Sequence, residues 1–298
     1  MAHNHQRSNS NLKVAFFLNL GFTILEIIVG LYVNSVAILS DAVHDFGDSL
    51  SLGLSWMLEK KAQQKPDKKY SFGYARFSLL GALINSVVII ISSGFIVSEA
   101  IERIINPEQS NAQGMFLFAL VGISVNGYAA WRLSTGKTMN ERVISWHLIE
   151  DVLGWVAILV VSVILMFKDV PFLDPILSLA ITFYILWNVI KRLKETVFLF
   201  LQGTPNDVDV DSIEAKIRSV KGVDNVHHTH VWSLEGEQHV FTTHIKLLPI
   251  NNLSELLSVK NEVKEVMEKY SFKHYTIETE LTDELCGEGA IPVQNISK

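Results

Sequence analysis

The sequence predicts a membrane protein built as an all-α bundle of six transmembrane helices, followed by a small α+β domain. Six apolar stretches, each long enough to cross the roughly 30 Å hydrocarbon core, precede residue 203. Beyond it the periodicity and charge of the chain become those of a soluble domain. Charged residues make up 19% of the 298 residues, against about 25% in soluble proteins. We therefore expect a polar N-terminal tail (1–12), a transmembrane domain (13–203) and a C-terminal domain (204–298).

The six predicted spans follow one another with short connections. They cover residues 13–33, 36–58, 77–101, 115–133, 144–167 and 174–200. Asn34 and Ser35 alone separate the first two, so these helices should form a tight hairpin.

Basic residues in the connections predict the orientation, because cytoplasmic loops are enriched in Lys and Arg. The second connection carries Lys60, Lys61, Lys65, Lys68, Lys69 and Arg76. The third connection, residues 106–114, carries none. We expect a multi-pass protein of the inner (plasma) membrane, with both termini and the C-terminal domain in the cytoplasm.

Two predicted spans repeat the pattern His-x-x-x-Asp inside the membrane. His44 and Asp48 lie in the second span, and His147 and Asp151 in the fifth. Residues four apart share one face of a helix. Two facing helices would present two imidazoles and two carboxylates, a set that suits tetrahedral Zn²⁺. The alternative, polar contacts that hold helices together, explains the repeated pattern less well, because burying four such groups without a cation is costly.

Other polar residues of the spans are predicted to support this site or to join helices. Asp41, Asp45 and Glu150 are candidates for the ion pathway or for groups that position the ligands. Asn19, Glu26 and Asn85 are interpreted as contacts between spans, since such hydrogen bonds are common in membranes.

After residue 205 the pattern predicts two helices and three strands. The helices should cover residues 207–220 and 253–270, and the strands residues 226–234, 239–248 and 273–281. Glu235-Gly236-Glu237 should form a hairpin turn between the first two strands.

Strand alternation locates candidate metal ligands in the C-terminal domain. It places His244, His274 and Glu280 on the more exposed face of the sheet, where a metal ion could reach them. The alternative is that they are ordinary polar residues of an exposed face. On the first strand, alternation places His228 and His230 on one face and His227 on the opposite one.

Composition excludes some functions. A net charge of −6, from 25 basic and 31 acidic residues, argues against a nucleic-acid partner, which requires a basic face. No His-Glu-x-x-His motif is present, so we expect a protein that is not an enzyme. An intramembrane metalloenzyme and a membrane metal sensor without transport remain the alternatives.

Several segments match a known family in order and spacing. They are SVAILSDAVHDFGDSLS at 35–51, YSFGYAR at 70–76, NERVISWHLIED at 140–151, LQGTP at 201–205 and VHHTHVW at 226–232. The chain resembles the cation diffusion facilitator family, of the bacterial zinc, cobalt and cadmium efflux type.

The resemblance implies a homodimer in the lipid bilayer that exports Zn²⁺ from the cytoplasm in exchange for H⁺ by alternating access. Carried over by position, the transport site is His44, Asp48, His147 and Asp151. A His at the first of these positions favours Zn²⁺, with Cd²⁺ and Co²⁺ as further divalent substrates.

The resemblance also implies a metallochaperone-like cytoplasmic domain that binds Zn²⁺ as a structural or regulatory ion. His227 and His230 become ligand candidates beside His244, His274 and Glu280. In some relatives N-terminal His and C-terminal Cys residues complete a site between protomers. Cys286, His3 and His5 are the matching candidates here.

Overall fold

A computed structural model describes the backbone of all residues except 1, 63, 135–138, 285 and 287–298. The side chains of residues 2–15, 55, 56, 59, 60, 62, 132–134 and 139–147 also lie outside the description. The chain divides into two compact units, which are described separately. The first comprises Met1–Gln64 and Leu80–Glu195, and the second Lys65–Leu79 and Thr196–Lys298.

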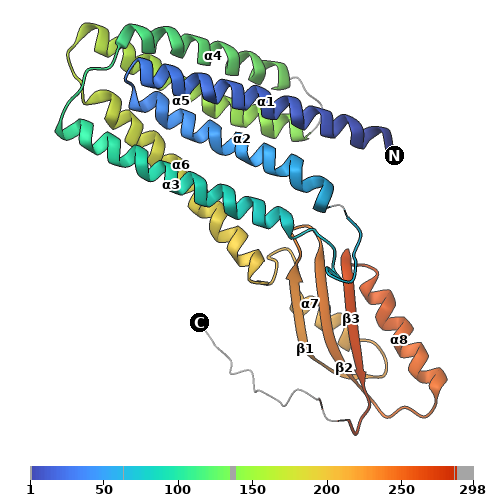
Figure 1. The fold of residues 1–298 in the computed structure, drawn as a ribbon. Helices are drawn as coiled ribbons and strands as arrows, with labels where there is room; N and C mark the ends of the chain where they lie inside the picture. The colour runs from blue at the N-terminus through green and yellow to red at the C-terminus, as the bar shows by residue number, and fades with distance from the viewer. Residues whose placement is uncertain (1, 63, 135–138, 285, 287–298) are drawn as a thin grey trace. The chain divides into compact units, whose positions relative to one another are not determined.

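Six long helices, drawn from blue to yellow in Figure 1, confirm the predicted helices. They are α1 (Ala2–Tyr32), α2 (Val36–Ala62), α3 (Phe77–Ile105), α4 (Ala112–Ser134), α5 (Met139–Phe167) and α6 (Leu173–Phe200). The α1 backbone begins at Ala2, within the segment predicted as a polar tail.

Four helices are long and apolar enough to cross a membrane, counted over the described residues: α3, α4, α5 and α6. The described apolar part of α1, Phe16–Tyr32, is shorter. Helix α2 carries Asp41, Asp45 and Asp48, which reduce its apolar character. Length and composition thus confirm four of the six predicted spans.

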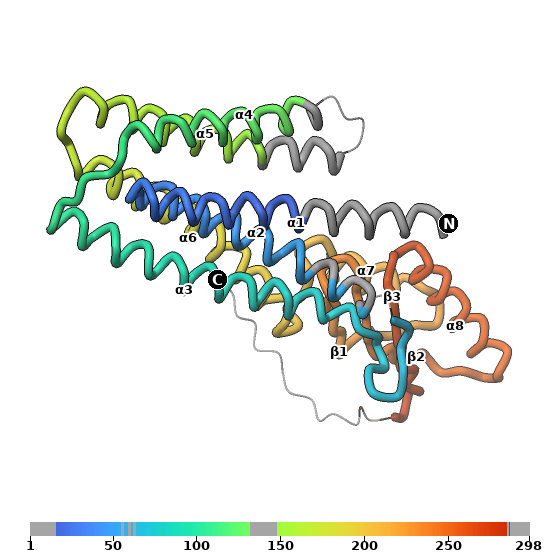
Figure 2. The backbone as a smooth tube through the Cα atoms, turned by 45° about the horizontal axis from the view of Figure 1, so that its top comes forward, coloured from blue at the N-terminus to red at the C-terminus, as the bar shows by residue number. Residues whose placement is uncertain are grey.

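The predicted tight hairpin joins α1 to α2. Asn34 adopts φ 55°, a left-handed conformation that asparagine tolerates better than most residues. The Ser35 amide donates to the Gly30 carbonyl at 2.9 Å. Helix α1 lies beside α2, and α4 beside α5 (Figure 2).

At the same end of the bundle, Asp174 of α6 caps the N-terminus of α2. Its carboxylate accepts hydrogen bonds from Ser35 Oγ at 2.6 Å and from the Val36 amide at 2.7 Å. Asp174 is fully buried, and it satisfies amides that have no partner inside the helix. The first turn of α6 is therefore bonded directly to the first turn of α2.

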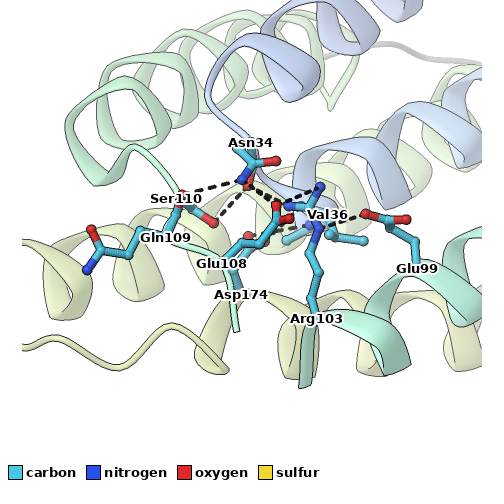
Figure 3. A network of polar contacts seen from close by, with 9 residues as sticks. Asn34, Val36, Glu99, Arg103, Glu108, Gln109, Ser110 and Asp174 are labelled. Atoms are coloured by element: carbon cyan, nitrogen blue, oxygen red, sulfur yellow. Dashed lines mark hydrogen bonds and ion pairs between the residues drawn. The ribbon is translucent and has the colours of Figure 1, made fainter. Parts of the chain in front are cut away.

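Arg103, at the end of α3, connects the third helix to this hairpin. Its Nη1 donates to the Asn34 carbonyl at 2.9 Å, and its Nε donates to Glu99 at 2.8 Å. Asn34 Nδ2 in turn donates to Glu108 at 2.9 Å. Figure 3 shows these contacts converging on the turn between α1 and α2.

Helices α4 and α5 approach closely where Trp155 is buried. The Trp155 ring contacts the Phe118 ring at 5.3 Å between centroids. A Cβ atom built at Gly122 would lie 2.2 Å from this ring, so the position accepts only glycine without rearrangement. Trp155 lies four residues after Asp151 and so fixes the α5 turn that carries the acid.

The C-terminal domain is α+β, as predicted. Its elements are α7 (Val210–Arg218), β1 (Val223–Ser233), β2 (His239–Leu247), α8 (Leu253–Met267) and β3 (Phe272–Glu280). The sheet order is β1-β2-β3, as Figure 1 shows. Strand β1 is antiparallel to β2, and β3 is parallel to it after the crossover through α8. Phe241 and Ile245 of β2 pack with Ile217 of α7 and Val263 of α8 in one apolar core.

The predicted turn between β1 and β2 is confirmed. The Leu234 amide donates to the Gln238 carbonyl at 2.8 Å. Gly236 has φ 117°, a conformation in which a side chain would be strained.

The loop before α3 belongs to the same unit as the C-terminal domain, which the sequence did not predict. The Phe72 ring lies 6.2 Å from Trp232 and 5.3 Å from His274 between centroids. Within the loop, the Tyr74 hydroxyl donates to Asp67 at 2.6 Å, and this hydrogen bond lowers the pKa of Asp67. The aromatic contacts of Phe72 thus hold the loop against the sheet, and the bond between Tyr74 and Asp67 stabilises the loop itself.

Candidate metal centres

Three of the four predicted transport-site ligands meet between α2 and α5. His44 Nε2 lies 3.8 Å from Asp48 Oδ2 on its own helix and 3.8 Å from Asp151 Oδ1 on the facing helix. The helical repeat brings Asp48 one turn from His44, and the packing of α2 on α5 brings Asp151 to it. One imidazole therefore stands between two carboxylates, an arrangement that attracts a divalent cation.

His147 is the fourth predicted ligand. It belongs to α5, four residues before Asp151, but its side chain lies outside the described residues. Its role stays a prediction.

Glycine allows α2 to lie close to α3 beside these ligands. Gly47 directly precedes Asp48, and a Cβ built there would lie 2.5 Å from Ile89 of α3. A larger residue would force the Ile89 side chain to move at the level of the acid.

A cavity of about 520 Å³ adjoins the three ligands. Its walls come from α2, α3, α5 and α6. Besides the ligands, its polar lining includes Asp41, Asn85, Glu150, Tyr184, Asn188 and Arg192. Sequence reasoning missed Asn188 and Arg192 of α6 as candidates for this site. Their spacing of four residues could have indicated a shared polar face of the sixth helix, because residues four apart lie on one side of a helix.

The predicted supporting residues divide into two groups. Asp41 and Glu150 line the cavity, and the Tyr184 hydroxyl donates to Glu150 at 3.4 Å. Asp45 is buried and is not part of the cavity lining. Its backbone carbonyl accepts a hydrogen bond from Asn19 of α1 at 3.0 Å.

A second cluster forms in the C-terminal domain from His227, His244, Glu280 and Cys286, hereafter the four-residue cluster. Each side chain offers one ligand atom, and these atoms all lie within 4.8 Å of one another. Glu280 Oε1 lies 2.9 Å from His244 Nδ1, and Glu280 Oε2 lies 3.2 Å from His227 Nε2. Cys286 Sγ lies 3.7 Å from His244 Nδ1.

Strand register explains how the cluster assembles. His227 of β1 pairs directly with His244 of β2, and the parallel neighbour β3 ends at Glu280 beside them. A bulge between His227 and His230 interrupts the alternation of β1, and His228 adopts φ 50°. The His227 and His228 rings consequently lie 5.3 Å apart. The prediction that they face opposite sides is wrong, because a bulge breaks the two-residue period.

Two predicted ligands lie elsewhere. His274 is exposed and packs against Phe72, and His230 is exposed. The structure does not bring either of them into the four-residue cluster. Cys286 lies in this cluster, and its predicted role in a site between protomers with His3 and His5 stays a prediction. The His3 and His5 side chains lie outside the described residues.

The electrostatics of the cluster favour a cation. Burial by itself raises the pKa of Glu280, but hydrogen bonds with His244 and Cys286 and the nearby imidazoles lower it below its usual value overall. Glu280 is therefore a carboxylate at neutral pH. Two imidazoles, a carboxylate and a thiol form a donor set that suits tetrahedral Zn²⁺.

Comparison with known proteins gives two family models that together span most of the chain. A model described as the cation efflux transmembrane domain matches residues 12–201. A model described as the cytoplasmic domain of cation efflux proteins matches residues 205–281.

Similar proteins come from several bacteria. A Bacillus subtilis protein named cadmium, cobalt and zinc/H(+)-K(+) antiporter is 30% identical over 94% of this chain and 92% of its own. The zinc transporter ZitB of Pectobacterium atrosepticum is 32% identical over 93% of this chain and 87% of its own. A solved structure titled as the metal-bound C-terminal domain of the CzcD transporter from Cuprividus metallidurans is 30% identical, covers 25% of this chain and 100% of its own, with a TM-score of 0.22.

Proposed function

Because this chain belongs to the cation efflux family of membrane transporters, we propose that it exports Zn²⁺ from the cytoplasm in exchange for protons. The observation that carries the proposal is the position of His44 between Asp48 and Asp151 on two facing helices, beside a polar cavity. Cd²⁺ and Co²⁺ are further substrates in the proposal, in keeping with the name of the Bacillus subtilis relative.

The ligands explain why a divalent cation binds inside the membrane. Two carboxylates carry the two negative charges that neutralise Zn²⁺, and imidazole nitrogen is a preferred zinc ligand. His147, four residues before Asp151, supplies the fourth ligand in this proposal. A neutral complex crosses an apolar medium far more readily than a charged one.

Proton exchange follows from the same chemistry. An imidazole must be neutral to bind a metal, and its ordinary pKa is about 6.5, so protons and Zn²⁺ compete for the site. We propose that the cytoplasm-facing site releases protons and binds Zn²⁺, and that the outward-facing site takes up protons and releases the metal. Movement of the bundle between the two states provides alternating access.

A pH gradient should therefore drive transport. In proteoliposomes preloaded with Zn²⁺, an inward proton gradient should accelerate zinc release several-fold, and a protonophore should remove the acceleration. A zinc-sensitive dye on the outside gives the rate. The name of the Bacillus subtilis relative includes K⁺ as well as H⁺. Zinc release is therefore measured with and without K⁺, which separates coupling to protons from coupling to potassium. Zinc release that ignores every imposed pH gradient would disprove proton exchange.

The four-residue cluster, in this proposal, binds a second Zn²⁺ that tightens a homodimer or senses cytoplasmic metal. The donor set and the ionised Glu280 support this reading. The family model for the C-terminal domain supports a cytoplasmic location, with both termini on that side of the inner membrane.

Removing one ligand of the cluster should weaken regulation and leave transport in place. His244→Ala should lower the apparent zinc affinity or the thermal stability of the full-length protein, because Glu280 and Cys286 lose their shared neighbour. Part of the zinc flux should remain. Equilibrium dialysis should count about one zinc ion fewer per chain, since the cluster offers one tetrahedral site.

The control for this variant is His274→Ala, which removes an exposed imidazole outside the cluster. It should keep the parent zinc count. Complete loss of flux in His244→Ala would show that the C-terminal site is part of the transport pathway.

The remaining alternative is a metal sensor that transports nothing. Purified protein in sealed vesicles discriminates between the two, since a sensor would bind Zn²⁺ without moving it. The polar cavity beside the ligands favours transport.

A further inference from the structure

Glu26 is a buried acid that the transport site does not use. It lies in the second half of α1 and is fully buried, and neither carboxyl oxygen has a hydrogen-bond partner. Two turns earlier, Asn19 donates to Ser49 of α2, and one turn earlier Thr23 donates to the Asn19 carbonyl. The contact predicted between spans thus exists for Asn19, whereas the side chain that approaches Glu26 from α2 is another acid, Asp45.

The groups around Glu26 are acids. Asp45 and Asp41 act on it from α2, and Asp151 acts on it from α5. These three are themselves buried. Within the described part of the chain, no ion pair or hydrogen bond connects Glu26 to a cation.

An ionised carboxylate in these surroundings is strongly disfavoured. Burial without a partner costs several kcal/mol, and each nearby carboxylate adds repulsion. Glutamic acid in its neutral form avoids both penalties.

We propose that Glu26 is a proton-binding site of the transport cycle, separate from the metal ligands. The proposal rests on the proposed function, because its proton exchanges against the transported cation. When a divalent cation binds beside Asp151, its positive charge replaces the repulsion that kept Glu26 neutral. The O–H bond of Glu26 then breaks and the proton passes to water. When the cation leaves, the carboxylate takes a proton from water and returns to the acid.

Infrared difference spectroscopy tests the protonation directly, without any need for transport. The carboxylic C=O band of a neutral acid should disappear when Zn²⁺ is added to the full-length protein. In Glu26→Gln this band change should be missing, because the amide cannot ionise. Glu102→Gln, at an exposed position of α3, is the matched control and should behave as the parent.

Flux in proteoliposomes tests the consequence. Glu26→Gln mimics the neutral acid, so zinc transport should continue while the number of protons exchanged per Zn²⁺ falls by about one, since one carboxyl carries one proton. Glu26→Asp keeps a carboxyl and should keep the parent ratio, which guards against a variant that fails to fold. A parent-like ratio in Glu26→Gln, or an unchanged C=O band on zinc addition, would assign Glu26 a purely structural role. Absence of zinc flux in the parent would instead overturn the proposed function.

Discussion

Replacing either Asp48 or Asp151 with alanine should reduce the initial rate of zinc transport by at least about 100-fold, the upper range for residues that merely support a metal ligand. Each substitution removes one of the two carboxylates that flank His44. The remaining imidazoles and single acid leave the bound cation with an uncompensated positive charge. Such a charge is costly inside the bilayer.

The measurement is zinc flux into proteoliposomes, compared at equal amounts of folded protein. Asp48→Asn and Asp151→Asn keep the size of the side chain, so a similar loss in them would attribute the effect to charge. Asp169→Ala, an exposed position between α5 and α6, is the control and should transport as the parent. Normal flux in either alanine variant would remove that residue from the site.

The proximity of His44, Asp48 and Asp151 was predictable because most of its geometry is local. A His and an Asp four residues apart share a helical face whatever the rest of the fold does. Only one tertiary fact was needed beyond this, that α2 faces α5. The apolar period also located all six helices to within a few residues at most ends.

The C-terminal cluster was less predictable because it depends on strand register and on chain reversal. The bulge after His227 shifts the alternation of β1. The residue types between His227 and His230 do not predict a bulge. The His274 ring packs against Phe72, which belongs to a loop about 200 positions earlier in the chain. Cys286 reaches His244 because the chain turns after β3, where the Leu281 amide donates to Glu284 at 2.6 Å.

The contacts of Asp174 could not be predicted from the sequence either, although they bond the N-terminus of α2 to α6. This carboxylate joins two helices that are 138 residues apart in the chain. Replacing Asp174 with alanine should destabilise the protein by about 3 kcal/mol, because it removes a helix cap and leaves the buried Ser35 hydroxyl and Val36 amide without an acceptor. The thermal midpoint in detergent, followed by tryptophan fluorescence, should fall by several degrees.

Transport should fall in Asp174→Ala as well, for a mechanical reason. Helix α2 carries His44 and Asp48 two to three turns beyond the cap, so a loosened first turn shifts both ligands relative to Asp151. Asp174→Asn keeps one acceptor oxygen and should lose less stability and less flux than the alanine variant. The Asp169→Ala control removes a carboxylate from the same end of the bundle, where its contact with Gln109 is exposed. Equal stability in Asp174→Ala and Asp169→Ala would mean that α2 is held by helix packing alone, and that the cap contributes nothing to the position of the ligands.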